Sequence, residues 1–157
     1  MGAYFKCYKK GNVIKKTLIK KKNGSLYPTI NDFNGKIYLI KKYLENFIVD
    51  TKVNYDGKYI RVEQPLIIGK DIFKFLKDEK RKPKRFNQFS QKLNNLYLKT
   101  GILPDLVNNE NILVTKDDEI KIIDIWPLFF KKRIEDGDVS EQSYKENLKK
   151  FNFLKNI

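Results

Sequence analysis

The spacing of apolar residues changes along this chain from the period of a strand to the period of a helix. Residues 3–8 and 12–20 are short runs rich in Tyr, Phe, Val, Ile and Thr, and the turn formers Lys10-Gly11-Asn12 separate them. This pattern is typical of a β-hairpin. From Ile30 onward the apolar residues recur every three or four positions, which predicts an amphipathic helix over residues 30–47.

The rest of the chain continues this mixture of locally paired strands and separate helices. Strands are predicted at 48–54 and 58–68 around the turn Asp56-Gly57, and Gly69 ends the second of them. A further pair of strands is predicted at 112–115 and 120–124. Helices are predicted at 71–78, from 86 to before Gly101, and at 138–155, where Asp138 or Ser140 caps the last helix. Residues 21–29 have the composition of a loop. This order predicts an α+β fold and not a repeating βαβ fold.

The absence of histidine restricts the chemistry that the chain can perform. Its 157 residues include no histidine and one cysteine, Cys7. Ser-His-Asp and Cys-His catalysis, histidine-ligated zinc and an internal disulfide are therefore excluded. Any acid–base chemistry must use Asp, Glu, Lys or Tyr.

Neither a membrane-spanning run of apolar residues nor an apolar signal sequence is present. We therefore expect a protein with no membrane span in a reducing, cytoplasmic compartment. A secreted effector exported by a route other than Sec remains an open alternative, because such a route leaves no readable signature in this sequence.

The net charge of +14 is high, and lysine supplies most of it. It fits a nucleic acid, an anionic membrane surface or a phosphorylated small molecule as partner, and it equally fits a lysine-rich proteome. One basic connector would meet an anionic partner through Lys80, Arg81, Lys82, Lys84 and Arg85. Arginine, which suits bidentate phosphate recognition, is scarce, and this weakens the nucleic-acid interpretation.

The richest chemistry lies in residues 101–128. A polar loop after Gly101 contains Asp105 and Asn111, and a tight hairpin of apolar strands then ends in Asp124. Two carboxylates and an amide would thus lie at the mouth of one hairpin. Phosphoryl transfer needs such a set, with one carboxylate to orient or deprotonate a hydroxyl nucleophile and hard oxygen ligands for Mg²⁺.

This stretch resembles the protein-kinase superfamily, including aminoglycoside-phosphotransferase-like enzymes, whose loop reads His-(Arg/Gly)-Asp-Leu-x-x-x-Asn before a hairpin that ends in Asp-Phe-Gly. The resemblance implies an ATP- and Mg²⁺-dependent phosphotransferase in which Asp105 is catalytic and Asn111 and Asp124 hold the metal. The chain departs from the pattern at Pro104, in its Asp105-to-Asn111 spacing of six, and at Ile125-Trp126-Pro127, which predicts a rigid segment after Asp124.

The first half of the chain resembles the nucleotide-binding lobe of the same superfamily. Gly2 to Gly11 is similar to the end of a glycine-rich loop, and the strand after it implies Lys15 as the phosphate-binding lysine, with Lys16 as the alternative if the register differs. Successive strand residues face opposite ways, so only one of the two lysines can face the nucleotide. Residues 61–66, with Glu63, resemble the hinge strand whose backbone meets adenine.

Together these features imply a two-lobed, kinase-like fold with a much reduced C-lobe. Residues 1–69 would form a sheet with one helix, and residues 70–157 a reduced helical lobe with the catalytic hairpin, in one compact unit. The helix 30–47 has no glutamate at its centre to pair with the lysine. Two alternatives follow: a pseudokinase that acts as a binding or regulatory module, and a basic nucleic-acid-binding domain. The sequence leaves the acceptor hydroxyl, on a protein or a small molecule, unidentified.

Overall fold

The computed structural model describes residues 5–18, 30–124, 129–135, 137 and 139–157. Within this part the chain forms two antiparallel sheets and five α-helices, so the predicted α+β class is confirmed. The loop predicted at 21–29, the glycine-rich segment before Phe5, the rigid segment at 125–127 and the cap Asp138 lie outside the described residues. No helix in the described ranges is both long enough and apolar enough to cross a membrane.

The first sheet has four strands in the order β1-β2-β4-β3, and all neighbours are antiparallel. Its strands are β1 (Phe5–Lys10), β2 (Val13–Leu18), β3 (Lys52–Tyr55) and β4 (Ile60–Pro65). Gly11 and Gly57 occupy the left-handed backbone region in the two hairpin turns, where other residues would be strained. Both predicted hairpins are therefore confirmed.

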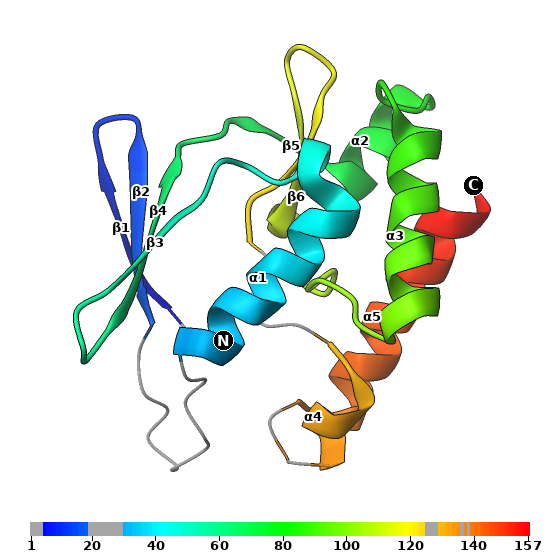
Figure 1. Cartoon of the computed structure of the whole chain (residues 1–157). Helices are drawn as coiled ribbons and strands as arrows, with labels where there is room; N and C mark the ends of the chain where they lie inside the picture. Colours follow the sequence, from blue (N-terminus) through cyan, green and yellow to red (C-terminus); the bar gives the residue numbers. More distant parts are fainter. Residues whose placement is uncertain (1–4, 19–29, 125–128, 136, 138) are drawn as a thin grey trace.

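Helix α1 (Ile30–Leu44) lies between the first sheet and the remaining helices (Figure 1). It buries the predicted stripe of apolar residues, and a 3-10 turn (Glu45–Phe47) extends it. The chain then joins the second sheet, because the backbone N–H of Val49 donates to the carbonyl of Ile122 at 3.1 Å. This bond ties the first half of the chain to the strand that precedes Asp124.

The second sheet has the order β5-β6-β7, formed by β5 (Gly69–Asp71), β6 (Ile112–Thr115) and β7 (Ile120–Ile122). The hairpin β6–β7 was predicted, whereas β5 was not, because Gly69 was expected to end a strand. Gly69 instead allows close approach: a Cβ on it would lie 2.5 Å from the carbonyl oxygen of Val114. Glycine is thus the residue that lets β5 pair with β6.

Four helices complete the fold: α2 (Ile72–Glu79), α3 (Phe86–Thr100), α4 (Lys131–Glu135) and α5 (Glu141–Asn156). The side chain of Asp71 accepts a hydrogen bond from Lys74 N and begins α2, and Ser140 caps α5 in the same way through Ser143 N, as predicted. Gly101 ends α3 in the left-handed conformation and donates to Tyr97 O. The short helix α4 was not predicted.

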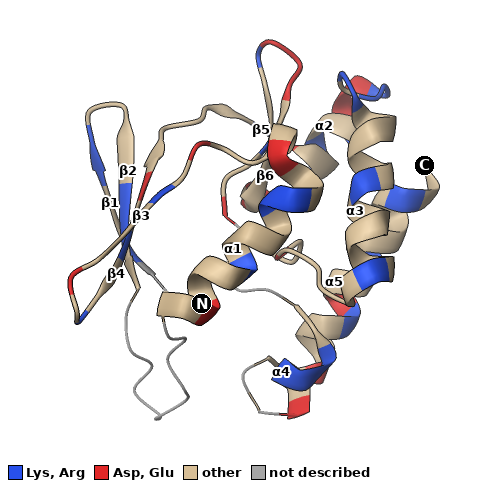
Figure 2. Ribbon diagram, in the orientation of Figure 1, with Lys and Arg blue, Asp and Glu red and all other residues tan. Residues whose placement is uncertain are grey.

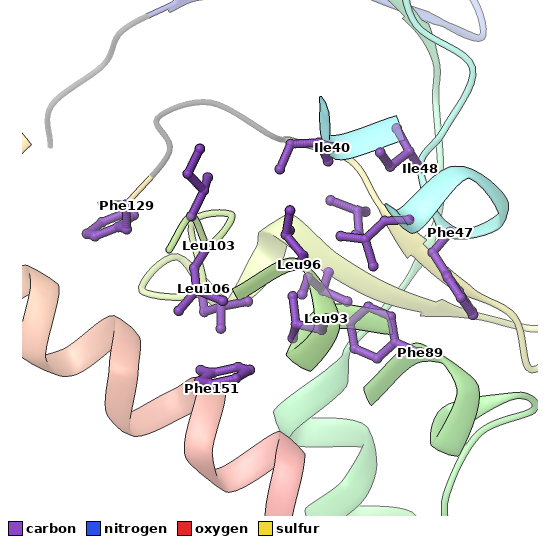
Figure 3. Packing of buried hydrophobic residues seen from close by; sticks show 14 of the residues in the cluster. Ile40, Phe47, Ile48, Phe89, Leu93, Leu96, Leu103, Leu106, Phe129 and Phe151 are labelled. Carbon is purple, nitrogen blue, oxygen red and sulfur yellow. The ribbon is translucent and has the colours of Figure 1, made fainter. Parts of the chain in front are cut away.

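One hydrophobic cluster runs from β2 to the end of α5. Helix α3 contributes Phe89 and Leu96 at its centre, and Phe151 of α5 packs from the other side (Figure 3). Leu103 and Leu106 enter the same cluster from the loop after α3. Because these two leucines are almost fully buried, they hold the loop residue between them, Asp105, in a defined place.

Candidate functional site

Asp105 lies in the loop between α3 and the 3-10 turn Asn109–Asn111 and is partly buried. Its Oδ1 accepts hydrogen bonds from the backbone N–H groups of Val107 at 2.9 Å and Asn108 at 3.2 Å. Burial raises the pKa of this carboxyl group, and the two backbone bonds oppose that rise. A desolvated carboxylate with a raised pKa is the kind of group that acts as a base near neutral pH.

Two residues of α5, which the sequence analysis missed, hold this loop. Asn147 is fully buried; its Oδ1 accepts from Leu106 N at 2.7 Å and its Nδ2 donates to Pro104 O at 3.1 Å. Lys150 donates to Val107 O at 2.7 Å. Asn147 therefore binds the backbone on both sides of Asp105. The signal was present as a polar residue on the otherwise apolar stripe of that helix.

Asn111 lies between the two candidate carboxylates. Its side chain is buried, and its Nδ2 donates to the carbonyl of Asp105 at 3.2 Å. Its own carbonyl accepts from Ile123 N at 2.8 Å, next to Asp124. Asn111 is thus bonded to the backbone of Asp105 and to that of Ile123, the residue before Asp124.

Lys16 of β2 reaches this site from the first sheet. Its side chain is buried, its Nζ lies 3.4 Å from Asp124 Oδ2, and the same Nζ donates to Ile123 O at 3.1 Å. Cys7 of β1 is the cross-strand partner of Lys16. Desolvation raises the pKa of the Cys7 thiol, the charge of Lys16 lowers it, and the charge of Asp124 raises it. The ion pair therefore joins the first sheet to the end of the β6–β7 hairpin.

Lys15 and Glu63 lie on the other face of the same sheet. They are paired in the β2–β4 register, and Lys15 Nζ lies 3.4 Å from Glu63 Oε2 with both side chains more than a third exposed. Glu63 also lines a surface cavity of about 220 Å³ together with Val13 and Lys52. The structure therefore brings Lys16, and not Lys15, to Asp124, and it pairs Glu63 with Lys15 on the other face of the sheet.

The donor set around Asp124 can be tested against Mg²⁺. In the described part of the chain no three Asp, Glu or Cys side chains gather to form a metal site. Mg²⁺ nevertheless commonly binds one or two protein oxygens and takes its remaining ligands from water and substrate phosphates. The carboxylate of Asp124, which is partly exposed, and the amide oxygen of Asn111 are donors of the kind that this smaller requirement needs.

Comparison with known proteins provides little further information. No family model matches the chain, and no curated protein matches it either. A 2.2 Å crystal structure of WbdD shares 13% identity at a TM-score of 0.47, covering 97% of this chain and 35% of that chain. A co-crystal structure of WbdD and a kinase inhibitor shares 13% identity at a TM-score of 0.44, covering 84% of this chain and 32% of that chain.

This chain thus spans about a third of the length of the two WbdD chains. Because both TM-scores are below 0.5, neither comparison supports an argument about function. The proposal that follows therefore depends on the side-chain geometry.

Proposed function

We propose that this chain is an ATP- and Mg²⁺-dependent phosphotransferase with a reduced kinase-like fold, which transfers a phosphoryl group to a hydroxyl acceptor. The observation that carries the proposal is the ion pair between the buried Lys16 and the partly exposed Asp124, at the end of the hairpin that follows Asp105 and Asn111. Lys16 comes from a distant part of the sequence to the segment that contains the other three groups, and each of the four suits one requirement of phosphoryl transfer.

The burial of Lys16 supports a functional role for it. Removing a charged pair from water costs several kcal/mol per ion, and a well-packed apolar pair is often as stable, so stability alone gives little reason to keep the pair. A lysine held beside a metal-binding carboxylate is, however, suited to contact the phosphates of a nucleotide. Lys16 therefore takes the role that the sequence analysis assigned first to Lys15.

The other three residues would divide the remaining tasks. Asp124 and Asn111 would hold Mg²⁺, which would neutralise the charge of the phosphates. Asp105 would orient the acceptor hydroxyl. The backbone bonds to its Oδ1 would fix the carboxyl group in place while it accepts the proton of that hydroxyl.

A thermal-shift experiment with matched lysine variants tests the nucleotide site. At 100 times its dissociation constant a ligand stabilises the folded state by about 2.7 kcal/mol, which for a domain of this size raises the melting temperature by roughly 5 to 10 °C. We expect this rise with Mg-ATP for the wild type and for Lys15→Met. We expect its loss for Lys16→Met and for Asp124→Ala.

The two lysine variants decide the assignment, because the substitution is the same and only the face of β2 differs. A rise that persists in Lys16→Met and disappears in Lys15→Met would show that the nucleotide meets the opposite face. The absence of a rise in all four proteins would refute a nucleotide site. Melting temperatures without ligand verify that each variant is folded.

A pseudokinase, which would bind nucleotide without transferring phosphate, is the second candidate. The observation in its favour is the partner of Lys16: within the described residues it pairs with Asp124 and with no carboxylate of α1. Transfer of the γ-phosphate separates the two candidates. An enzyme transfers or hydrolyses it in a manner that Asp105→Asn abolishes, whereas a pseudokinase shows the thermal shift alone.

A further inference from the structure

Helices α2 and α5 border an open groove on the surface, separate from the Lys16–Asp124 site. The groove has a volume of about 1130 Å³. It is lined by Phe73, Leu76, Lys77, Lys80, Arg81, Lys82, Gln142, Lys145, Glu146, Lys149, Lys150, Phe153 and Ile157. Two contacts join its walls: Lys82 Nζ donates to the carbonyl of Ile157 at 3.0 Å, and Lys150 lies over the ring of Phe73.

The groove follows a complete face of α5. One face of this helix is buried in the core through Tyr144, Asn147, Phe151 and Leu154. The groove-lining residues recur every three or four positions from Gln142 to Ile157 on a second face. At about 1.5 Å per residue this face is roughly 22 Å long, which is the length of a helix of about four turns.

The floor of the groove is apolar and accessible. The rings of Phe73 and Phe153 pack with their centroids 6.0 Å apart, and Leu76 lies beside them in the lining. Phe153 is 47% exposed and Ile157 is 42% exposed, although both are large apolar residues. An exposed apolar surface within a polar rim is typical of a site for another molecule.

The rim of the groove is strongly basic. Seven of its lining residues are Lys or Arg and one is Glu. In Figure 2 the blue of Lys and Arg marks the segment after α2 and parts of α5. Arg81 pairs with Asp118 and Lys145 with Glu141, whereas Lys77, Lys80 and Lys149 have no ion pair among the described residues. The rim therefore retains positive charge that nothing in the described chain neutralises.

The basic connector of the sequence divides at this groove. Lys80, Arg81 and Lys82 line it, whereas Lys84 donates to Asp117 O and Arg85 donates to Gln88 Oε1 within the protein. The five cations thus do not form one continuous stripe for a nucleic-acid backbone. Three of them instead border an apolar surface.

We propose that this groove binds an acidic amphipathic helix of a partner protein. Apolar side chains at positions i, i+3 or i+4 and i+7 of that helix would pack on Phe73, Phe153 and Ile157, and flanking Asp and Glu would meet Lys77, Lys80 and Lys149. A second copy of this chain is a poor occupant, because each copy carries a net charge of +14. The proposal does not depend on phosphotransferase activity.

A display library of random 16-residue peptides tests the proposal on the full chain. Selection should enrich acidic sequences whose apolar residues recur every three or four positions. One enriched peptide is then synthesised with a fluorescent label, and its affinity is measured by anisotropy. Its circular dichroism should show a gain of helix on binding, since the groove is expected to order it.

Matched variants test whether the peptide occupies this groove. We expect Phe153→Ala, and separately the pair Lys77→Glu and Lys149→Glu, to weaken binding by about tenfold or more. Leu98 and Lys99 provide the controls, because both are exposed on α3 and outside the groove. Leu98→Ala and Lys99→Glu should leave the affinity within about twofold.

Several outcomes would overturn the proposal. The selection could enrich no sequence, or it could enrich basic or non-amphipathic sequences. The enriched peptides could also bind both groove variants as tightly as they bind the wild type. Binding of oleate or of phosphatidylglycerol vesicles that Phe153→Ala abolishes, with no peptide bound, would assign the groove to an anionic lipid instead. Far-UV circular dichroism verifies that every variant is folded.

Discussion

Replacement of Asn147 by leucine provides the sharpest test of how the loop around Asp105 is held. Leucine fills a similar volume but can make neither hydrogen bond of the fully buried asparagine. The backbone N–H of Leu106 and the carbonyl of Pro104 would then be buried without partners. Each such group costs about 1 to 3 kcal/mol, so Asn147→Leu should lower the free energy of unfolding by about 2 to 6 kcal/mol.

Urea unfolding followed by far-UV circular dichroism measures this change. Asn152→Leu is the matched control, because Asn152 is an exposed asparagine of the same helix and the substitution is identical. It should change the free energy of unfolding by less than about 0.5 kcal/mol. If the two variants lose the same amount, or if Asn147→Leu loses less than about 1 kcal/mol, the two backbone bonds do not hold the loop.

Two further predictions concern stability. Burial raises the pKa of Asp105 in the folded protein above its ordinary value of 3.8. The folded state therefore gains stability from protonated Asp105 below pH 3.8, and it loses this stability as the pH rises through the raised pKa. Asp105→Asn should therefore melt at a higher temperature than the wild type at neutral pH, with the difference vanishing in acid; a lower melting temperature at neutral pH would contradict this. Gly69→Ala should destabilise by about 1 to 3 kcal/mol, because its Cβ would meet the backbone of Val114. Gly35→Ala, in open space within α1, should stabilise by about 0.5 to 1 kcal/mol, and urea unfolding of the two alanine variants should give opposite signs.

The local elements could be predicted because their signals lie within a few residues. The hairpin turns at Gly11 and Asp56-Gly57, the helix beginning at Ile30 and the cap at Ser140 all depend on residues that are neighbours in sequence. The α+β class followed from their order. The candidate loop from Asp105 to Asp124 was also visible in sequence, because its polar residues interrupt buried apolar segments.

The elements that were missed depend on distant partners. Strand β5 has three residues, and it exists as a strand through its pairing with β6, more than forty positions later. The role of Asn147 depends on the loop around Asp105, again about forty positions away. Short segments and single polar residues carry too little local signal to predict such contacts.

The sequence by itself determined that the chain pairs its strands locally and that Lys15 and Lys16 face opposite sides of one strand. It also determined that histidine takes no part in any chemistry of this chain. Only the tertiary structure decided which lysine meets Asp124, because the face of β2 turned toward the β6–β7 hairpin is set by how the first sheet packs on the rest of the chain. The same packing placed the basic residues after α2 beside the groove-lining face of α5. Alternation along a strand is a local property of the backbone, whereas the choice of the buried face depends on the whole core.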